Sequence, residues 1–281
     1  MADEEWDWVG SIFDESGYHE FARSVKHDAR YVHRREAREF LTKVLETLPA
    51  RRGLLKTGLV LCRAQRGFTL GQVEGEECDR EMAHPPERMV PTPEHCLDGR
   101  VSPRGIPCLY LASNMKTAVA EVRPWVDAYV SLAQFKIVKE CRVVDCRAAK
   151  SDKLDKQQAL IWSDIAYAFS KPMSPEEPHL EYVPTQILAE TFREHGFDGL
   201  VYESLLNKGT NIALFDPKNA DLMNCGLHKI RAVNFDFALA DNPYFMTQHY
   251  PEIEAQIAGR EAQPAEALED AQATAADETS G

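Results

Sequence analysis

The chain has 281 residues, of which 44% are hydrophobic and 27% are charged, and its formal net charge is −13. This much apolar material supports one large domain with appendages or two small domains. The charge is uneven, because residues 252–281 hold eight acidic side chains and one basic one, Arg260. An acidic balance disfavours broad binding to nucleic acid, which requires clustered Lys and Arg. It still allows a local basic pocket for a phosphate-bearing small molecule.

The seven cysteines are odd in number and include no Cys-x-x-Cys pair, which is typical of reduced thiols in a cytosolic protein. The chain starts Met-Ala-Asp-Glu-Glu-Trp, without a basic and then apolar leader, and no apolar run is long enough to span a bilayer. We therefore expect a soluble, cytoplasmic protein with no membrane partner. No two histidines lie three or four residues apart, so no metal site is expected.

The N-terminal part is predicted to be a helical extension covering residues 1–52. Residues 18–48 have a helical pattern, and between His33 and Leu48 the apolar side chains recur every three or four residues. Pro49 and Gly53 are expected to end this helix.

The middle of the chain alternates strand signals with breakers. Residues 58–64 and 107–112 are expected to be strands, and the Pro- and Gly-rich segment 66–107 between them is expected to be a long functional loop. Asn114 has the position of an N-cap for a helix that runs to Val122 or Arg123, where Pro124 helps to end it.

The remaining segments complete a mixed α+β domain over residues 53–250. Strands are expected at 128–138, 141–146, 198–202, 211–215 and 227–238, and helices at 154–169 and 185–195, with Gly196 as a helix stop. Strands 198–202 and 211–215 are too close for a crossover helix, so they are expected to be antiparallel. The order favours a mixed, largely antiparallel sheet with flanking helices rather than a doubly wound parallel sheet. Residues 251–281 are expected to be an acidic disordered tail.

Two charged residues stand in unusual places. Glu121 lies in the last turn of a predicted helix, where the helix dipole disfavours an acid, so it is a catalytic candidate. The alternative is a salt bridge to Arg123 or to a nearby lysine. Arg63 ends the apolar run Leu-Val-Leu-Cys and is a candidate anion binder, although a surface arginine at a strand end explains it equally well. Nucleotide motifs such as Gly-x-Gly-x-x-Gly and the Walker loop are absent from the sequence.

Two further residues carry weaker signals. Tyr110 lies in Leu-Tyr-Leu-Ala, eleven residues before Glu121, and such a tyrosine is more often a half-buried core ring. Ser204 follows a predicted strand and precedes a turn with Gly209, a position where serine is usually a turn former.

Several ordered motifs resemble the RES domain family, named for an Arg, a Glu and a Ser, over about residues 57–235. They are Gly99-Arg-Val-Ser-Pro-Arg-Gly-Ile-Pro-Cys-Leu-Tyr-Leu-Ala112, Thr117-Ala-Val-Ala-Glu-Val-Arg-Pro124, Tyr182-Val-Pro-Thr-Gln186, Gly196-Phe-Asp-Gly-Leu-Val-Tyr202 and Asn211-Ile-Ala-Leu-Phe-Asp-Pro217. The resemblance places the family's Arg at Arg63, its Glu at Glu121, its Ser at Ser204 and its tyrosine at Tyr110.

The resemblance implies a fold similar to ADP-ribosyltransferases and an action on NAD⁺, by phosphorolysis or hydrolysis. It also implies a toxin that an Xre-type antitoxin neutralises. NAD⁺ is then the substrate, and no separate cofactor is expected. A protein ADP-ribosyltransferase and a catalytically inactive NAD-binding or interaction module remain alternatives, and a homodimer remains open.

Chemistry suggests roles for these residues. Breaking the nicotinamide–ribose bond passes through an oxocarbenium-like state, and nicotinamide departs neutral, so a carboxylate near the ribose helps and no general acid is needed. Glu121 is the candidate for that carboxylate. Arg63 is the candidate for binding the pyrophosphate, with Arg100 as a second choice, and Tyr110 is expected to stack on nicotinamide or ribose. A second set is expected to contact the dinucleotide: Arg100, Gln186, Ser204 and Asn211. The acceptor is left open between water, phosphate and a protein side chain.

Overall fold

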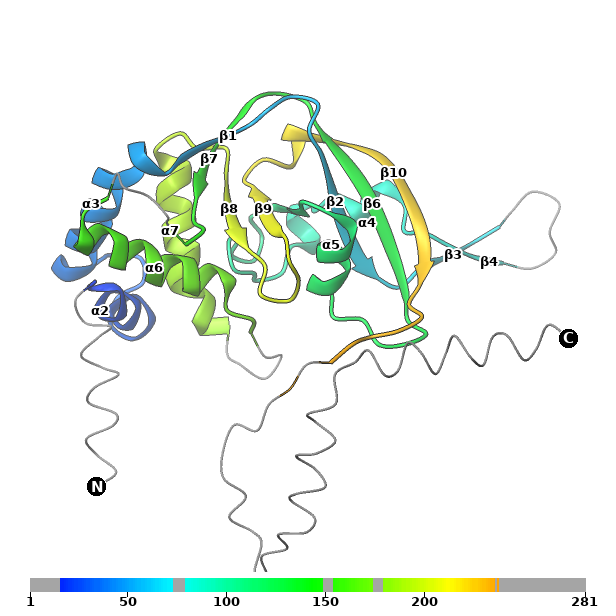
Figure 1. The fold of residues 1–281 in the computed structure, drawn as a ribbon, viewed down its shortest axis with the longest axis horizontal. Helices are drawn as coiled ribbons and strands as arrows, with labels where there is room; N and C mark the ends of the chain where they lie inside the picture. The colour runs from blue at the N-terminus through cyan, green and yellow to red at the C-terminus, as the bar shows by residue number, and fades with distance from the viewer. Residues whose placement is uncertain (1–15, 73–78, 149–153, 174–178, 236, 238–281) are drawn as a thin grey trace, which may run out of the picture. The chain divides into compact units, whose positions relative to one another are not determined.

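The computed structural model describes residues 16–72, 79–148, 154–173, 179–235 and 237. Within this part of the chain the main element is an eight-stranded sheet with the strand order β1-β7-β8-β9-β5-β2-β6-β10 (Figure 1). In that order the strands are Arg52–Leu55, Cys141–Asp145, Gly199–Glu203, Thr210–Leu214, Leu109–Ala112, Val60–Arg66, Tyr129–Ile137 and Ala220–Lys229. Every neighbouring pair is antiparallel except β7 and β8, which are parallel. The predicted mixed α+β class is confirmed, as is the antiparallel pairing of β8 with β9.

The sheet opens between β5 and β2. These two strands share a single register pair, Cys62↔Ala112, whereas β2 pairs with β6 along its whole length, from Val60 to Arg66. On one face both halves still share an apolar core that includes Leu61, Leu109 and Phe135. Toward the end of β2 the two strands diverge, and this divergence makes room for a cleft.

Helices pack at the β1 side of the sheet (Figure 1). They are α2 (Tyr18–Arg23), α3 (Arg35–Thr47), α6 (Lys156–Ser170) and α7 (Val183–Glu194). Their inward faces form one hydrophobic core that includes Phe21, Phe40, Trp162 and Phe192. Inside this core the Trp162 indole donates a hydrogen bond of 2.8 Å to Thr47 Oγ1. The predicted N-terminal extension thus shares its core with α6 and α7.

The helical character expected over residues 18–48 is confirmed, and in the structure it is divided between two helical segments. A π-helical turn over Ser24–Asp28 follows α2, and at Ala29 the backbone becomes extended with φ −156°. The connection is solvated, since Tyr31 is 90% exposed and Val32 is 79% exposed. Without a surface to bury these apolar side chains, helix propensity alone does not hold the segment helical.

Two residues predicted to begin or end a helix do so in the structure. Asn114 caps α5 (Met115–Glu121), and its side chain accepts a hydrogen bond of 2.9 Å from the Thr117 amide. Gly196 follows α7 with φ +77°, the left-handed conformation that ends many helices. Both predictions are confirmed.

The last strand was expected at 227–238, but β10 covers Ala220–Lys229. This strand lies at the edge of the sheet, and only Ala220 in it is buried, so it lacks the apolar alternation that marks a half-buried strand. A register shift between Leu222 and Asn224 disturbs the alternation further.

Short elements inside the expected loop 66–107 were also missed. A second sheet pairs β3 (Thr69–Gly71) with β4 (Arg80–Met82), and a short helix, α4, covers Pro86–Met89. Strand β1 (Arg52–Leu55) was missed too, because it has only four residues. Such short segments hold too few side chains for a periodic pattern.

The described residues up to Val233 belong to one compact unit. Among the described residues, no helix combines the length and the apolar character needed to cross a membrane. The six cysteines in the described part of the chain are free thiols. The predicted tail 251–281 lies outside the described residues, and the proposed domain boundaries remain predictions.

Candidate active site

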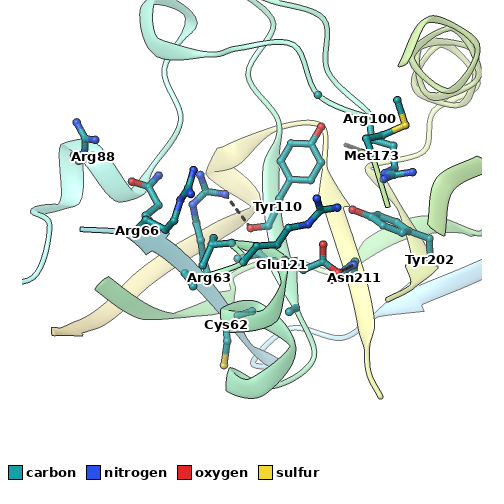
Figure 2. A pocket seen from close by; sticks show the side chains of 18 of the residues that line it. Cys62, Arg63, Arg66, Arg88, Arg100, Tyr110, Glu121, Met173, Tyr202 and Asn211 are labelled. Carbon is teal, nitrogen blue, oxygen red and sulfur yellow. Dashed lines mark hydrogen bonds between the residues drawn. The ribbon is translucent and has the colours of Figure 1, made fainter. Parts of the chain in front are cut away.

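A cleft of about 920 Å³ lies where β2 and β5 diverge (Figure 2). Its walls come from β2, β5, α5, β8 and β9, together with the loop at Gly99 and Arg100. Five arginines and one carboxylate line it: Arg63, Arg66, Arg88, Arg100, Arg123 and Glu121. The volume suits a ligand of cofactor size. The cleft is locally cationic although the whole chain is acidic.

Glu121, the last residue of α5, lines this cleft and lies between Arg63 and Asn211 in Figure 2. Its Oε1 accepts two hydrogen bonds, one of 2.6 Å from Ser204 Oγ and one of 2.7 Å from Asn211 Nδ2. Both donors come from the β8–β9 hairpin, so strand pairing sets their positions. Oε2 has no hydrogen-bond partner in the described part of the chain. The structure therefore brings together Glu121, Ser204 and Asn211 with one carboxylate oxygen left for a ligand.

The β8–β9 turn packs tightly against the start of α5. Ser113 and Thr210 exchange two hydrogen bonds, of 2.9 Å and 3.0 Å. A Cβ on Gly209 would lie 2.0 Å from Thr117 Oγ1, so only glycine fits there. This contact fixes the helix that presents Glu121 relative to the hairpin that presents its two donors.

Arg63 bridges the opening between β2 and β5. Its Nη1 donates a hydrogen bond of 3.0 Å to the carbonyl oxygen of Tyr110, which β2 leaves unpaired where the strands diverge (Figure 2). Its Nε is buried and has no hydrogen-bond partner in the described residues. Burial lowers the pKa of Arg63 from its ordinary value, an effect that the nearby Cys108 and Tyr110 oppose. The guanidinium stays charged at neutral pH and has further N–H groups for an anion.

Tyr110 lines the cleft, but its hydroxyl group is occupied. The hydroxyl oxygen accepts hydrogen bonds from the amides of Val101, at 2.9 Å, and Ser102, at 3.2 Å, and lies 3.1 Å from Ser102 Oγ. Burial raises its pKa well above the ordinary range, and the hydrogen bonds from Ser102 and Val101 oppose this only in part. A Cβ on Gly99 would lie 2.7 Å from this oxygen. The hydroxyl thus holds the 99–102 loop, which leaves the ring to contact a ligand.

Two other predicted ligand contacts also hold the scaffold. Arg100 lines the cleft, but it donates hydrogen bonds of 2.8 Å to Ala168 O and 2.5 Å to Lys171 O at the end of α6, where the helix dipole favours a cation. Gln186 is buried in α7 outside the cleft wall, and its amide donates to Gly99 O and Ser102 O at 2.8 Å and 3.3 Å. Their roles in ligand binding remain predictions.

Sequence reasoning named five of the residues that line the cleft and missed the others, among them Arg66, Arg88, Arg123 and Tyr202. Arg123 and Tyr202 lie inside the motifs that carry the family resemblance, so attention to the whole motif would have found them. Arg88 follows a Pro-rich segment, and only the tertiary fold brings it to the cleft. Arg66 ends β2, three residues after Arg63, where strand alternation predicts the opposite face.

Arg123 has an unusual backbone. It follows Val122, the C-cap residue of α5, and adopts φ +46°, the left-handed region that glycine prefers. A non-glycine residue held in this region costs about 1 kcal/mol or more, and such outliers cluster at ligand sites. The left-handed turn places the Arg123 side chain on the wall of the cleft beside Glu121.

The fold and the site together define an α+β protein with a cationic cleft for a small molecule. The family model for the RES domain matches residues 77–237, and the chain belongs to the RES domain family. The matched segment includes Tyr110, Glu121 and Ser204 but begins after Arg63.

Comparison with solved structures finds the crystal structure of the M. tuberculosis MbcT–MbcA toxin–antitoxin complex. The likeness has a TM-score of 0.39 and 12% sequence identity, and it covers 67% of this chain and 92% of that chain. Comparison with curated proteins finds no match.

Proposed function

We propose that the protein cleaves the bond between nicotinamide and ribose in NAD⁺. The observation that carries the proposal is a single carboxylate, Glu121, held by two donors at the edge of a cleft otherwise rich in arginine. Membership of the RES domain family supports the same substrate, because the family resemblance implies action on NAD⁺.

The proposed chemistry places Glu121 at the ribose. When the C1′–N bond breaks, its electron pair goes to the pyridine nitrogen and nicotinamide leaves as a neutral molecule. Positive charge develops at C1′ and on the ring oxygen, and the Glu121 carboxylate stabilises it. The donors Ser204 and Asn211 keep Oε1 fixed. Oε2 then accepts a hydrogen bond from a ribose hydroxyl without a movement of the carboxylate. The oxygen of the acceptor then bonds to C1′ and loses its proton.

Arg63 is the proposed partner of the pyrophosphate. Its charge and its unused N–H groups at the centre of the cleft fit a diphosphate better than Arg100, whose two terminal nitrogens already bind the end of α6. Tyr110 contributes its ring, which is available for stacking, because its hydroxyl is engaged with the 99–102 loop.

The decisive experiment incubates the purified chain with NAD⁺, with and without phosphate, and identifies the products by mass. ADP-ribose indicates hydrolysis, and ADP-ribose-1″-phosphate that forms only with phosphate indicates phosphorolysis. Label from NAD⁺ on a protein band indicates protein ADP-ribosylation, the second candidate activity. Intact NAD⁺ under all conditions overturns the proposal and favours a binding module.

The family resemblance further leads us to propose a toxin with an Xre-type antitoxin as its partner. Expression of the wild-type chain is expected to arrest growth and to deplete cellular NAD⁺, whereas the Glu121→Gln variant does neither. Co-purification with the product of a neighbouring gene tests the partner, and light scattering of the purified chain tests a homodimer. Normal growth with undiminished NAD⁺ would contradict the toxin role.

A further inference from the structure

The cationic charge of the cleft exceeds what a diphosphate requires. Arg63 and Arg100 each donate to backbone carbonyl oxygens, whereas Arg66, Arg88 and Arg123 line the cleft without a salt bridge to any described carboxylate. NAD⁺ carries two singly charged phosphates and a cationic nicotinamide. The proposed role of Arg63, with Arg123 beside Glu121, accounts for the diphosphate and leaves two unpaired guanidiniums at the far end of the cleft.

Arg66 and Arg88 lie at the same end of the cleft, away from Arg100 and Met173 (Figure 2). A set of contacts through His84 joins their two segments. His84 Nε2 lies 3.1 Å from the carbonyl oxygen of Arg66, and its amide donates a hydrogen bond of 2.9 Å to Ser131 Oγ on β6. Ser131 in turn donates to Gly67 O at 2.9 Å. The chain that enters α4 is therefore fastened to the end of β2.

The next residues fix the backbone at Arg88. Pro85 and Pro86 restrict the backbone at the start of α4. Met89, the neighbour of Arg88, is fully buried and packs in the core beneath the sheet. Arg88 is exposed on the cleft wall and carried by a rigid turn, as Arg66 is carried by the last position of β2. Two guanidiniums on fixed backbone at one end of the cleft can both reach an anion with two negative charges.

We propose that Arg66 and Arg88 bind a phosphate monoester, so that the protein takes NADP⁺ as well as NAD⁺. A monoester carries between one and two negative charges at neutral pH, and it presents three oxygens to paired guanidiniums. The 2′-phosphate of NADP⁺ is such a group on the adenosine ribose, beyond the pyrophosphate as seen from nicotinamide. This inference rests on the proposed cleavage of the nicotinamide–ribose bond.

The test compares kcat/KM for NADP⁺ and NAD⁺ in the full chain, in the Arg66→Gln/Arg88→Gln double variant and in Arg104→Gln. Arg104 is an exposed arginine of the same 66–107 segment that does not line the cleft, so it is the matched control. The wild type is expected to use both dinucleotides. In the double variant kcat/KM for NADP⁺ falls at least about tenfold more than kcat/KM for NAD⁺, because KM for NADP⁺ rises. Arg104→Gln behaves as the wild type.

Calorimetry with 2′,5′-ADP and 5′-AMP provides a readout that does not need turnover. The wild type is expected to bind 2′,5′-ADP more tightly by about tenfold, and the double variant loses this preference. Cleavage of NAD⁺ without cleavage or binding of the 2′-phosphorylated compounds overturns the inference alone. The inference is also overturned if the double variant loses only the dependence of NAD⁺ cleavage on inorganic phosphate. In that case Arg66 and Arg88 bind free phosphate as a co-substrate. If neither dinucleotide is cleaved, the proposed function fails. Calorimetry with 2′,5′-ADP then still tests whether Arg66 and Arg88 bind a phosphate monoester.

Discussion

At the residue scale, two hydrogen bonds set the position of the Glu121 carboxylate. Ser204 and Asn211 lie 83 and 90 residues away in the chain, yet both donate to the same oxygen. Family motifs predicted Glu121 and Ser204 individually, but their direct hydrogen bond depends on how β8–β9 packs on α5. For Asn211 the sequence suggested contact with the ligand, whereas in the structure its amide positions the carboxylate.

Glu121→Gln is expected to lower kcat by at least about 10²- to 10³-fold, because a neutral amide does not stabilise the positive charge that develops on the ribose. The amide has nearly the size of the carboxylate, so NAD⁺ affinity changes by only a few-fold. Turnover assays and calorimetry with NAD⁺ measure the two effects separately. Wild-type consumption of NAD⁺ by this variant would refute the assignment.

Arg123→Gly is expected to stabilise the fold by about 1 kcal/mol and to weaken NAD⁺ binding at the same time. Glycine adopts φ +46° without strain, so the backbone cost disappears. Glycine also raises the conformational entropy of the unfolded chain, which offsets part of this stabilisation. The guanidinium on the cleft wall is lost. Denaturant unfolding gives the first quantity, and KM for NAD⁺ gives the second. A variant that is both less stable and unchanged in KM would show that the left-handed residue has no part in the site.

At the scale of elements, the parts predicted well were those with chemical end signals. The N-cap of α5 and the glycine after α7 act within a few residues, so the sequence alone reveals them. Strand β10 and the hairpin β3–β4 were misplaced or missed because edge strands bury little and owe their position to their neighbours. The cleft itself follows from the divergence of β2 and β5, which no local pattern records.

The contact between the β8–β9 turn and α5 is expected to set the position of the whole helix. Gly209→Ala places a methyl group against Thr117 Oγ1 and is expected to destabilise the fold by about 1–3 kcal/mol. The same displacement moves Glu121 away from its donors, so kcat falls as well. Gly226→Ala on β10 is the control, because there a Cβ meets only the end of the His228 side chain, at 3.3 Å. Equal activity losses in the two variants would mean that the turn does not position α5.

At the scale of the whole molecule, the core holds several groups that must stay neutral. Burial is the largest cause that raises the pKa of Tyr18, Tyr110 and Tyr202 above 10.0, and of Cys108 and Cys146 above 9.0. Each raised pKa adds stability that is fully present below the ordinary value. That stability is lost as the pH rises, since the unfolded chain ionises first.

The free energy of unfolding is therefore expected to fall steadily above about pH 9, where cysteines of the unfolded chain begin to ionise, and faster above pH 10, where tyrosines follow. Thermal unfolding followed by circular dichroism from pH 7 to 11 measures this loss. Tyrosinate absorbance of the buried rings should rise together with the unfolding transition. A smooth titration of all tyrosines near pH 10 in folded protein would contradict it.

The sparse join between β2 and β5 has a consequence for amide hydrogen exchange. Apart from the apolar core on one face, the two halves of the sheet are joined by one residue pair and the Arg63–Tyr110 hydrogen bond. A dinucleotide that contacts both walls acts as a cross-link between them. Its binding is expected to slow exchange at amides of β6 and β10, strands that contribute no residue to the cleft wall. Binding of a dinucleotide would thus be recorded also in strands that never touch it.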